Sequence, residues 1–227
     1  QWCPNNGGYS GFQGATVKGI EGIVTADTSD IHAFSYSGPG GTQSSPRRII
    51  IQNGAGEWSG IWIFGNAVDY LKRGDKVRVK GVVEESNSMT RINVASASDV
   101  TFISTQNPLP SPQILTTAQL ANNKLDGDTT IEKWESVYVR FNVPFWISCI
   151  NAGTYSSCTS RQPLQDTAFR RNYGEILIVD NSNVEARIEL QDGGHTFTNN
   201  WDGVTIGKTL LTQNDSITFA QGILYYS

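Results

Sequence analysis

The sequence predicts an all-β protein made of two small barrels. Short runs of alternating apolar and polar residues recur along the chain, and turns rich in Gly, Asn and Ser separate them. This pattern indicates strands that bury one face. A proline-rich segment divides the strands into two groups, and signals for helices are few. Charged residues make up only 17% of the 227 residues, which suits a turn-rich β protein with an uncharged polar surface.

Four segments follow from this division. Residues 1–15 form an N-terminal arm, 16–104 a first barrel domain, 105–113 a proline-rich linker and 114–227 a second barrel domain. The linker contains PLPSP, and three prolines in five positions cannot continue a strand or a helix.

The first domain contains five or six expected strands and one short helical segment. TVKGIEGIVTA predicts a strand that bends at Gly19 or Gly22. RRIIIQN and GIWIFG predict a hairpin, and AVDYLKRG predicts a short helix or turn. TRINVAS and DVTFIST complete the domain. This number and order of strands favours a small closed barrel.

The segment DKVRVKGVVEE alternates strictly between apolar and basic residues. Such alternation predicts a strand with one buried and one exposed face. The residues expected on the buried face are Val77, Val79 and Val83, and those expected on the exposed face are Lys76, Arg78 and Lys80.

The second domain repeats this plan loosely. ESVYVRFNVPFWI predicts its first long strand, and GEILIVDNSNVEARIEL predicts a hairpin. NDSITFAQGILYYS resembles GDKVRVKGVVEES in its acidic turn, alternating strand and central Gly. TTAQLANNKL predicts a helix with Thr116 or Thr117 as its N-cap. The second barrel is expected either to lack its closing strand or to close with a short edge.

These segments resemble the oligonucleotide/oligosaccharide-binding (OB) domains of secreted bacterial nucleases and surface proteins. The resemblance depends on G-x-V-T-A, on I-x-I-Q-x-G-x-G, and on S-G-I-W-I followed by G-D-x-V-x-V-x-G-x-V. It covers roughly residues 16–227 and implies two tandem OB-like barrels. Because its motifs describe turns and core positions, it implies a fold more firmly than a function.

No residues point to catalysis. The nuclease members of that family carry a separate catalytic domain with His, Asp and Asn clusters, which this chain does not match. His32 and His195 lie in expected loops without the spacing of zinc ligands. The sequence therefore predicts a protein that is not an enzyme and has no metal site.

Two oxygen-rich segments offer ligands for Ca²⁺, the only cofactor that the sequence suggests. Neither fits the spacing of a known calcium loop, so both are interpreted as turns. Their residues are Asp126, Asp128 and Glu132 in one segment, and Asp180, Asn181 and Asn183 in the other.

A basic cluster in the first domain suggests a binding site for a single strand of nucleic acid. If Trp62 faces outward beside basic side chains, it offers a ring for bases and charges for phosphates. The alternative is an ordinary solvated face with Trp62 packed under a loop, which the balance of nine basic and nine acidic residues in 1–110 favours. The residues of this candidate site are Trp62, Lys76, Arg78, Lys80 and Arg91.

The three cysteines and the first residue bear on location. Cys149 and Cys158 bracket a short polar loop, and a disulfide between them predicts an extracellular protein; the alternative is two free thiols. Cys3 is then free or bridges to another chain. Gln1 is expected to follow a removed signal peptide, or else to reflect trimming. No apolar run has the length of a membrane span.

Aromatic residues at both ends of the chain suggest self-assembly. The arm either folds back on the first domain or docks on a neighbouring molecule, where an unclosed second barrel would accept a strand. The primary hypothesis is therefore a secreted, non-catalytic structural or surface protein that forms a filament or array. The alternative is an accessory module that binds single-stranded nucleic acid or carbohydrate. The assembly residues are Trp2, Cys3, Tyr9, Phe12, Tyr225 and Tyr226.

Overall fold

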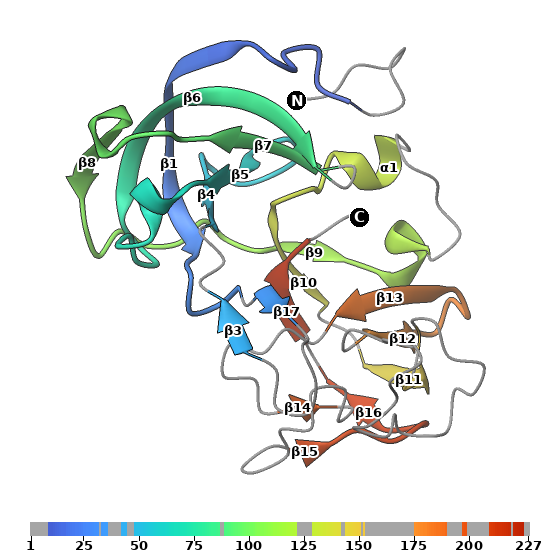
Figure 1. Ribbon diagram of the computed structural model, residues 1–227. Coiled ribbons are helices and arrows are strands. Elements are labelled where there is room, and N and C mark those ends of the chain that lie inside the picture. Colours follow the sequence, from blue (N-terminus) through green and yellow to red (C-terminus); the bar gives the residue numbers. More distant parts are fainter. Residues whose placement is uncertain are drawn as a thin grey trace.

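The protein is all-β, and its strands form two neighbouring groups, one from β1 to β8 and the other from β9 to β17 (Figure 1). The computed structural model describes residues 9–31, 33–35, 42–44, 48–86, 89–121, 129–141, 144–150, 152, 175–189, 197–198, 209–218 and 220–224. No helix among these residues is long and apolar enough to cross a membrane.

The first group of strands forms a closed five-stranded barrel. Its order is β1-β4-β5-β7-β6, and β6 pairs back onto β1 to close the ring. β5 and β7 run parallel, while the other neighbours in the ring run antiparallel. This is the Greek-key plan of the OB fold. The ring strands are β1 (Thr16–Ala26), β4 (Arg48–Gln52), β5 (Gly60–Phe64), β6 (Lys76–Ser86) and β7 (Met89–Asn93).

Several short elements accompany the barrel. β8 (Val100–Ser104) extends the sheet beyond β6, and β2 (Ala33–Ser35) pairs with β3 (Thr42–Ser44) between β1 and β4. A 3-10 turn, η1 (Asn66–Val68), follows β5, which confirms the short helical segment expected there. A second 3-10 turn, η2 (Ala97–Asp99), precedes β8.

Branched aliphatic side chains fill the barrel. The prediction that Val77, Val79 and Val83 face inward is confirmed, because each is at most 4% exposed. They pack with residues from every ring strand, and β-branched side chains suit such a pleated interior. Among the described residues, the buried core of this barrel comprises Val24, Ile49, Ile51, Ile63, Val68, Leu71, Val77, Val79, Val83, Ile92 and Val94.

The first strand bends where the sequence predicted. The register between β1 and β6 shifts between Lys18 and Ile20, and Gly19 between them has a φ of 78°. Gly19 tolerates this left-handed conformation because it has no Cβ. Gly22 serves a different purpose, since a Cβ there would lie 3.0 Å from the backbone nitrogen of Gln52. The bend lets one strand pair with β6 along most of its length and with β4 at its end.

The second group repeats the first four strands of this plan. β10 and β11 pair antiparallel with β17 and β16, as β1 pairs with β6, while β11 also pairs with β12 and β12 with β13. This confirms the expected hairpin and the resemblance between the two acidic-turn strands. Its elements are β9 (Gln113–Leu115), η3 (Thr117–Leu120), α1 (Thr129–Glu132), β10 (Tyr138–Phe141), β11 (Phe145–Cys149), β12 (Glu175–Val179), β13 (Glu185–Glu189), β14 (Phe197–Thr198), β15 (Thr209–Leu210), β16 (Ser216–Ile217) and β17 (Ala220–Ile223).

The expectation that the second barrel lacks its closing strand stays a prediction. Among the described residues, no strand pairs with both β13 and β17, as β7 pairs with both β5 and β6 in the first barrel. Instead β9 pairs parallel with β10, and Ala121 forms an isolated bridge with Ala186 of β13.

Two expectations for the second group are wrong. The long strand expected from ESVYVRFNVPFWI is two strands, β10 and β11, with Pro144 just before β11; proline lacks the N–H that a continuous ladder needs. In the described part of TTAQLANNKL, residues 116–121, the expected helix is replaced by the 3-10 turn η3, which Thr116 caps as predicted. That turn ends because Ala121 adopts an extended ψ of 130° and pairs with β13.

Candidate ligand-binding face of the first barrel

The outer face of β4, β5 and β7 carries aromatic, basic and amide side chains next to one another. Successive side chains in a strand point to opposite faces, so the neighbours of the inward isoleucines point away from the core. The strand register places them in two rows across the sheet. One row is Arg48, Phe64 and Asn93, and the other is Ile50, Trp62 and Arg91.

Two arginines on this face stack on two aromatic rings. The Arg48 guanidinium carbon lies 5.3 Å from the centre of the Trp62 ring, and that of Arg91 lies 4.4 Å from the centre of the Phe64 ring. Both separations allow a cation–π attraction. We call Arg48, Trp62, Phe64 and Arg91 the stacking ladder.

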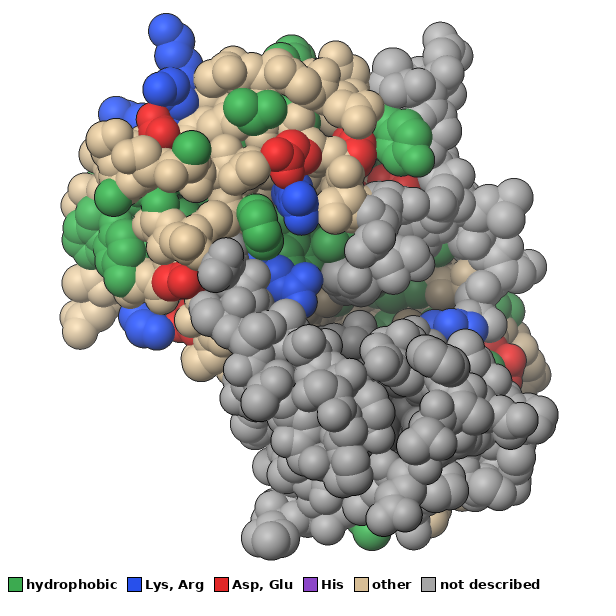
Figure 2. Space-filling view, viewed as in Figure 1, with side chains coloured by type: hydrophobic (Ala, Val, Ile, Leu, Met, Phe, Trp, Pro, Cys, Tyr) green, Lys and Arg blue, Asp and Glu red, His purple; other side chains and the backbone are tan. Residues whose placement is uncertain are grey.

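Hydrogen bonds hold one end of the stacking ladder in place. The Glu84 carboxylate accepts bonds from Asn93 Nδ2 at 2.8 Å and from Arg91 Nε at 3.0 Å. The hydrogen bond from Asn93 lowers the pKa of Glu84, and the hydrogen bond and positive charge of Arg91 lower it further. Partial burial raises this pKa by less, so the pKa of Glu84 lies below its usual value. Figure 2 shows basic, acidic and hydrophobic side chains side by side in the middle of the visible face of this barrel. Phe64, Glu84, Arg91 and Asn93 are all half-buried.

Trp62 is not the exposed platform that the sequence suggested. It points away from the barrel core, as its alternation with Ile63 requires, but it is only 4% exposed. A second, smaller cluster covers it, and Ile223 of β17 packs there too. The outward direction is therefore confirmed, and the burial of Trp62 agrees with the favoured alternative of a packed ring and not with an exposed platform. The cluster contains Ala26, Ile31, Ile50, Trp62 and Met89.

The predicted basic residues do not form one surface with Trp62. Only Arg91 pairs across the sheet with Trp62, whereas Lys76, Arg78 and Lys80 lie on the part of β6 that pairs with β1. Their outward direction is confirmed, since the three side chains are 41–56% exposed.

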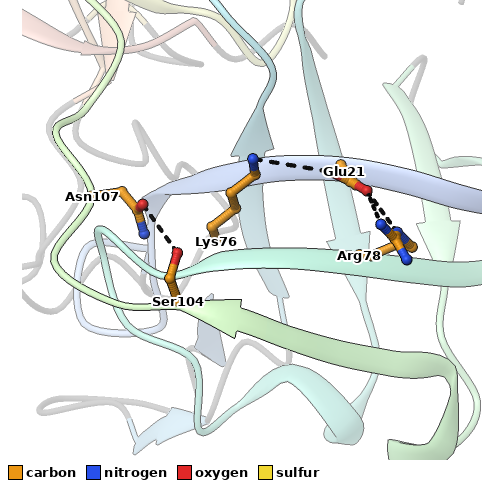
Figure 3. A network of polar contacts seen from close by, with 5 residues as sticks. All are labelled: Glu21, Lys76, Arg78, Ser104 and Asn107. Atoms are coloured by element: carbon orange, nitrogen blue, oxygen red, sulfur yellow. Dashed lines mark hydrogen bonds and ion pairs between the residues drawn. The ribbon is translucent and has the colours of Figure 1, made fainter.

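Each of these cations is paired with a carboxylate. Arg78 Nε donates to Glu21 Oε1 at 2.6 Å, and Lys76 Nζ lies 4.0 Å from Glu21 (Figure 3). Lys80 Nζ lies 2.9 Å from Asp99. On the ligand face, Arg91 likewise forms an ion pair with Glu84 at 2.9 Å. A phosphate would have to compete with these carboxylates for every cation of the predicted site.

The other end of the ligand face is covered by the second group of strands. The Tyr138 N–H donates to Gln52 Oε1 at 2.9 Å, and the Thr90 N–H donates to Glu135 Oε1 at 3.2 Å. Both bonds are buried. Gly60 lies so close to the Ser136 carbonyl that an added Cβ would overlap the oxygen.

Polar contacts continue at the rim of this interface. Arg73 donates to the Tyr138 hydroxyl at 2.9 Å, and the Trp58 N–H donates to the Lys133 carbonyl at 2.7 Å. Lys133 also pairs with Glu57 at 2.7 Å. The interface therefore covers the Gln52 and Gly60 end of the face and leaves the Phe64 end partly exposed.

The described part of the N-terminal arm lies on its own barrel. Ser10 is 3% exposed and its N–H donates to Glu85 Oε1 at 2.8 Å, while the Gly14 N–H donates to the Val83 carbonyl at 2.8 Å. Tyr9 and Phe12 nevertheless remain exposed, at 42% and 61%. These contacts favour the fold-back alternative for residues 9–15.

The remaining predicted residues divide into two sets. Cys149 is disulfide-bonded, but its predicted pairing with Cys158 stays a prediction. Glu132 lies in the helix α1 and is 4% exposed, so its assignment to a turn is wrong. No group of metal-binding side chains occurs among the described residues. The predicted residues that lie outside the described part of the chain are Trp2, Cys3, His32, Asp126, Asp128, Cys158, His195, Tyr225 and Tyr226.

Four residues of this face were not predicted from the sequence. Arg48 and Phe64 occupy outward positions of the predicted hairpin, so its alternation alone points to them. Asn93 and Glu84 join the face only because β7 pairs with both β5 and β6. The pairing of β7 with β5 connects strands distant in the sequence, and no local pattern indicates it.

Comparisons with known proteins add little to this geometry. No family model and no curated protein matches the chain. Among solved structures, the chain is similar to one titled "Structure and Conformational Change of a Replication Protein A Heterotrimer Bound to ssDNA". The two are 16% identical with a TM-score of 0.32, and the match covers 82% of this chain but 40% of the other. Because that score is low, the assignment of an OB plan depends on the strand order described above.

Proposed function

We propose that the protein is a non-catalytic binding module that holds a carbohydrate chain on the outer face of β4, β5 and β7. The observation that supports this most directly is the Phe64 end of the stacking ladder, where a half-buried ring and guanidinium lie beside a carboxylate and an amide. OB barrels bind oligonucleotides and oligosaccharides on the face that contains their second and third strands, which are β4 and β5 here. An apolar surface with a few fixed polar groups is typical of ligand sites.

The charges favour an uncharged ligand over a nucleic acid. Arg91 is already paired with Glu84, and the neighbouring basic strand is paired with Glu21 and Asp99. Binding to a phosphate backbone needs cations that can exchange counterions for phosphates. The net charge of the whole chain is −4, which repels a polyanion. A sugar instead offers a flat apolar face to the ring and hydroxyls to Glu84, Arg91 and Asn93.

We also propose that the protein is extracellular and related to the OB domains of secreted nucleases and surface proteins. The disulfide at Cys149 supports this location, because disulfides persist mainly in oxidising compartments. Peptide mapping of native protein under non-reducing conditions tests the location and the Cys149–Cys158 pairing together. Recovery of Cys149 as a free thiol would contradict both.

The experiment for carbohydrate binding is calorimetric titration with neutral hexasaccharides of glucose, xylose and mannose. Phe64→Ala is expected to weaken binding of the preferred sugar about tenfold, equivalent to about 1.4 kcal/mol of lost stacking. Asn93→Ala is expected to weaken it by a similar factor, since it removes a hydrogen-bond donor and loosens Glu84.

Tyr70→Ala is the matched control. Tyr70 is an aromatic residue, is 56% exposed and lies outside the ligand face, in the turn after η1. Its loss is expected to leave the affinity unchanged. If Phe64→Ala binds every sugar as tightly as the wild type, the ligand does not occupy this face.

A further inference from the structure

The strand β8 forms the outer end of the first sheet. It pairs antiparallel with the first half of β6, whose other side pairs with β1. Among the described residues, β8 has no second neighbour. Figure 1 shows it at the margin of the molecule, away from the second group of strands. One row of its backbone N–H and C=O groups is therefore directed away from the sheet.

This edge is apolar and uncharged. Phe102 and Ile103 are 49% and 40% exposed, and Thr101 is also exposed. No charged residue occurs between Val100 and Gln113. Proteins usually protect sheet edges with lysines, prolines or bulges that prevent pairing with another chain. Residues 100–104 contain no lysine and no proline, and their one irregularity is a bulge at Ile103, which lies between the partners of Lys76 and Val77.

Contacts at both ends hold β8 in an extended conformation. At its start, Asp99 pairs with Lys80 at 2.9 Å, and Ser96 caps the preceding turn η2. At its end, Ser104 Oγ donates to Asn107 Oδ1 at 3.1 Å (Figure 3). Asn107 in turn donates from its backbone N–H and from Nδ2 to the Gly74 carbonyl, both at 2.9 Å. A partner strand therefore meets a preformed edge, which lowers the entropic cost of pairing.

We propose that β8 is a self-association surface, on which β8 of a second copy of this chain pairs antiparallel to extend the sheet across a two-fold axis. A second copy fits because an uncharged strand can pair with itself without placing like charges opposite one another. Phe102 and Ile103 of both copies become buried, and the outward backbone groups find partners. The surface is formed by β8 and not by β4, β5 or β7, so it does not depend on the proposed carbohydrate site.

Sedimentation velocity of the full chain over a range of concentrations tests this proposal. The wild type is expected to convert reversibly from monomer to dimer. Hydrogen exchange is expected to show that amides of residues 100–104 gain protection as the dimer forms. Phe102→Lys is expected to raise the dimer dissociation constant at least tenfold, because two lysines then approach each other across the axis. Thr101→Lys serves as a second variant that keeps both apolar side chains.

Ile114→Lys is the control, since Ile114 is 62% exposed on β9, in the other group of strands. Its dimer dissociation constant is expected to equal that of the wild type. The proposal is overturned if the wild type stays monomeric up to its solubility limit, or if Ile114→Lys weakens the dimer as much as Phe102→Lys. Protection gained only outside residues 100–104 would overturn it as well.

Discussion

Asp180 connects two elements of the second group through its side chain. Its carboxylate accepts a bond from the Thr117 N–H at 3.1 Å, at the start of η3, and one from the Ser182 N–H at 2.8 Å, in the turn after β12. Although burial raises it, these hydrogen bonds lower the pKa of Asp180 to about 2. The two carboxylate oxygens of Asp180, which the sequence suggested for calcium, thus accept hydrogen bonds within the protein.

This carboxylate makes part of the stability depend on pH. Because its pKa is lower in the folded state than in the unfolded state, its contribution is complete above about pH 5 and is lost as the pH falls through 4 towards 2. Asp180→Asn is expected to cost about 1–3 kcal/mol at neutral pH, the penalty for weakening buried hydrogen bonds. Urea unfolding at a series of pH values measures both effects.

Glu185→Gln, an exposed carboxylate on the same hairpin, is the control for this prediction. It is expected to keep the acid sensitivity of the wild type, whereas Asp180→Asn loses part of it. Equal slopes of stability against pH for all three proteins below pH 5 would contradict the assigned role of Asp180.

Trp62 shows how far single residues can be interpreted from the sequence. Alternation with Ile61 and Ile63 predicted that Trp62 points away from the barrel core, and the structure agrees. Its burial involves Ala26, Ile31 and Met89, which lie apart from it in the sequence, and Ile223 of the second group packs against the same cluster. Local periodicity reports the direction of a side chain but not what covers it.

At the scale of elements, the start of β5 lies tightly against the segment before β10. An added Cβ on Gly60 would overlap the Ser136 carbonyl, so Gly60→Ala must push the two backbones apart. We expect a loss of about 1–3 kcal/mol of stability, which is typical of overpacking. We also expect a larger radius of gyration by small-angle scattering, since the Tyr138–Gln52 bond lies in the same contact.

Gly222→Ala provides the comparison for this change. Gly222 lies in β17, and nothing lies within 4 Å of a Cβ added there. It is expected to leave the scattering curve unchanged. A Gly60→Ala protein with the stability and dimensions of the wild type would show that the two groups of strands do not pack as described.

Most elements of the first barrel could be predicted from the sequence. The hairpin β4–β5, the bend at Gly19 and the inward valines of β6 all follow from turn residues and period-two alternation, which are local signals. The division of the first long strand of the second group into β10 and β11 was missed although Pro144 is a local signal against a continuous strand, because the alternation on both sides of it favoured one strand. The pairing of β7 with β5 joins distant strands, and for that reason the complete ligand face was also missed.

At the scale of the whole molecule, three surfaces have separate roles in this account. The interface with the second group of strands covers one end of the OB face, the stacking ladder leaves the other end for a ligand, and β8 lies on neither. The order of the strands along the barrel separates them. Carbohydrate binding and self-association can therefore be measured independently in the same protein.

The most direct test of the central claim compares a neutral hexasaccharide with an oligothymidylate as ligands of the full chain across a range of salt concentrations. The account predicts that the sugar binds with an affinity that hardly changes with salt, that Phe64→Ala weakens it, and that the oligonucleotide does not bind at low salt. The account is contradicted if the oligonucleotide binds, if its affinity falls steeply as salt rises, and if Phe64→Ala abolishes this binding. Such a result would show that phosphates displace the paired carboxylates.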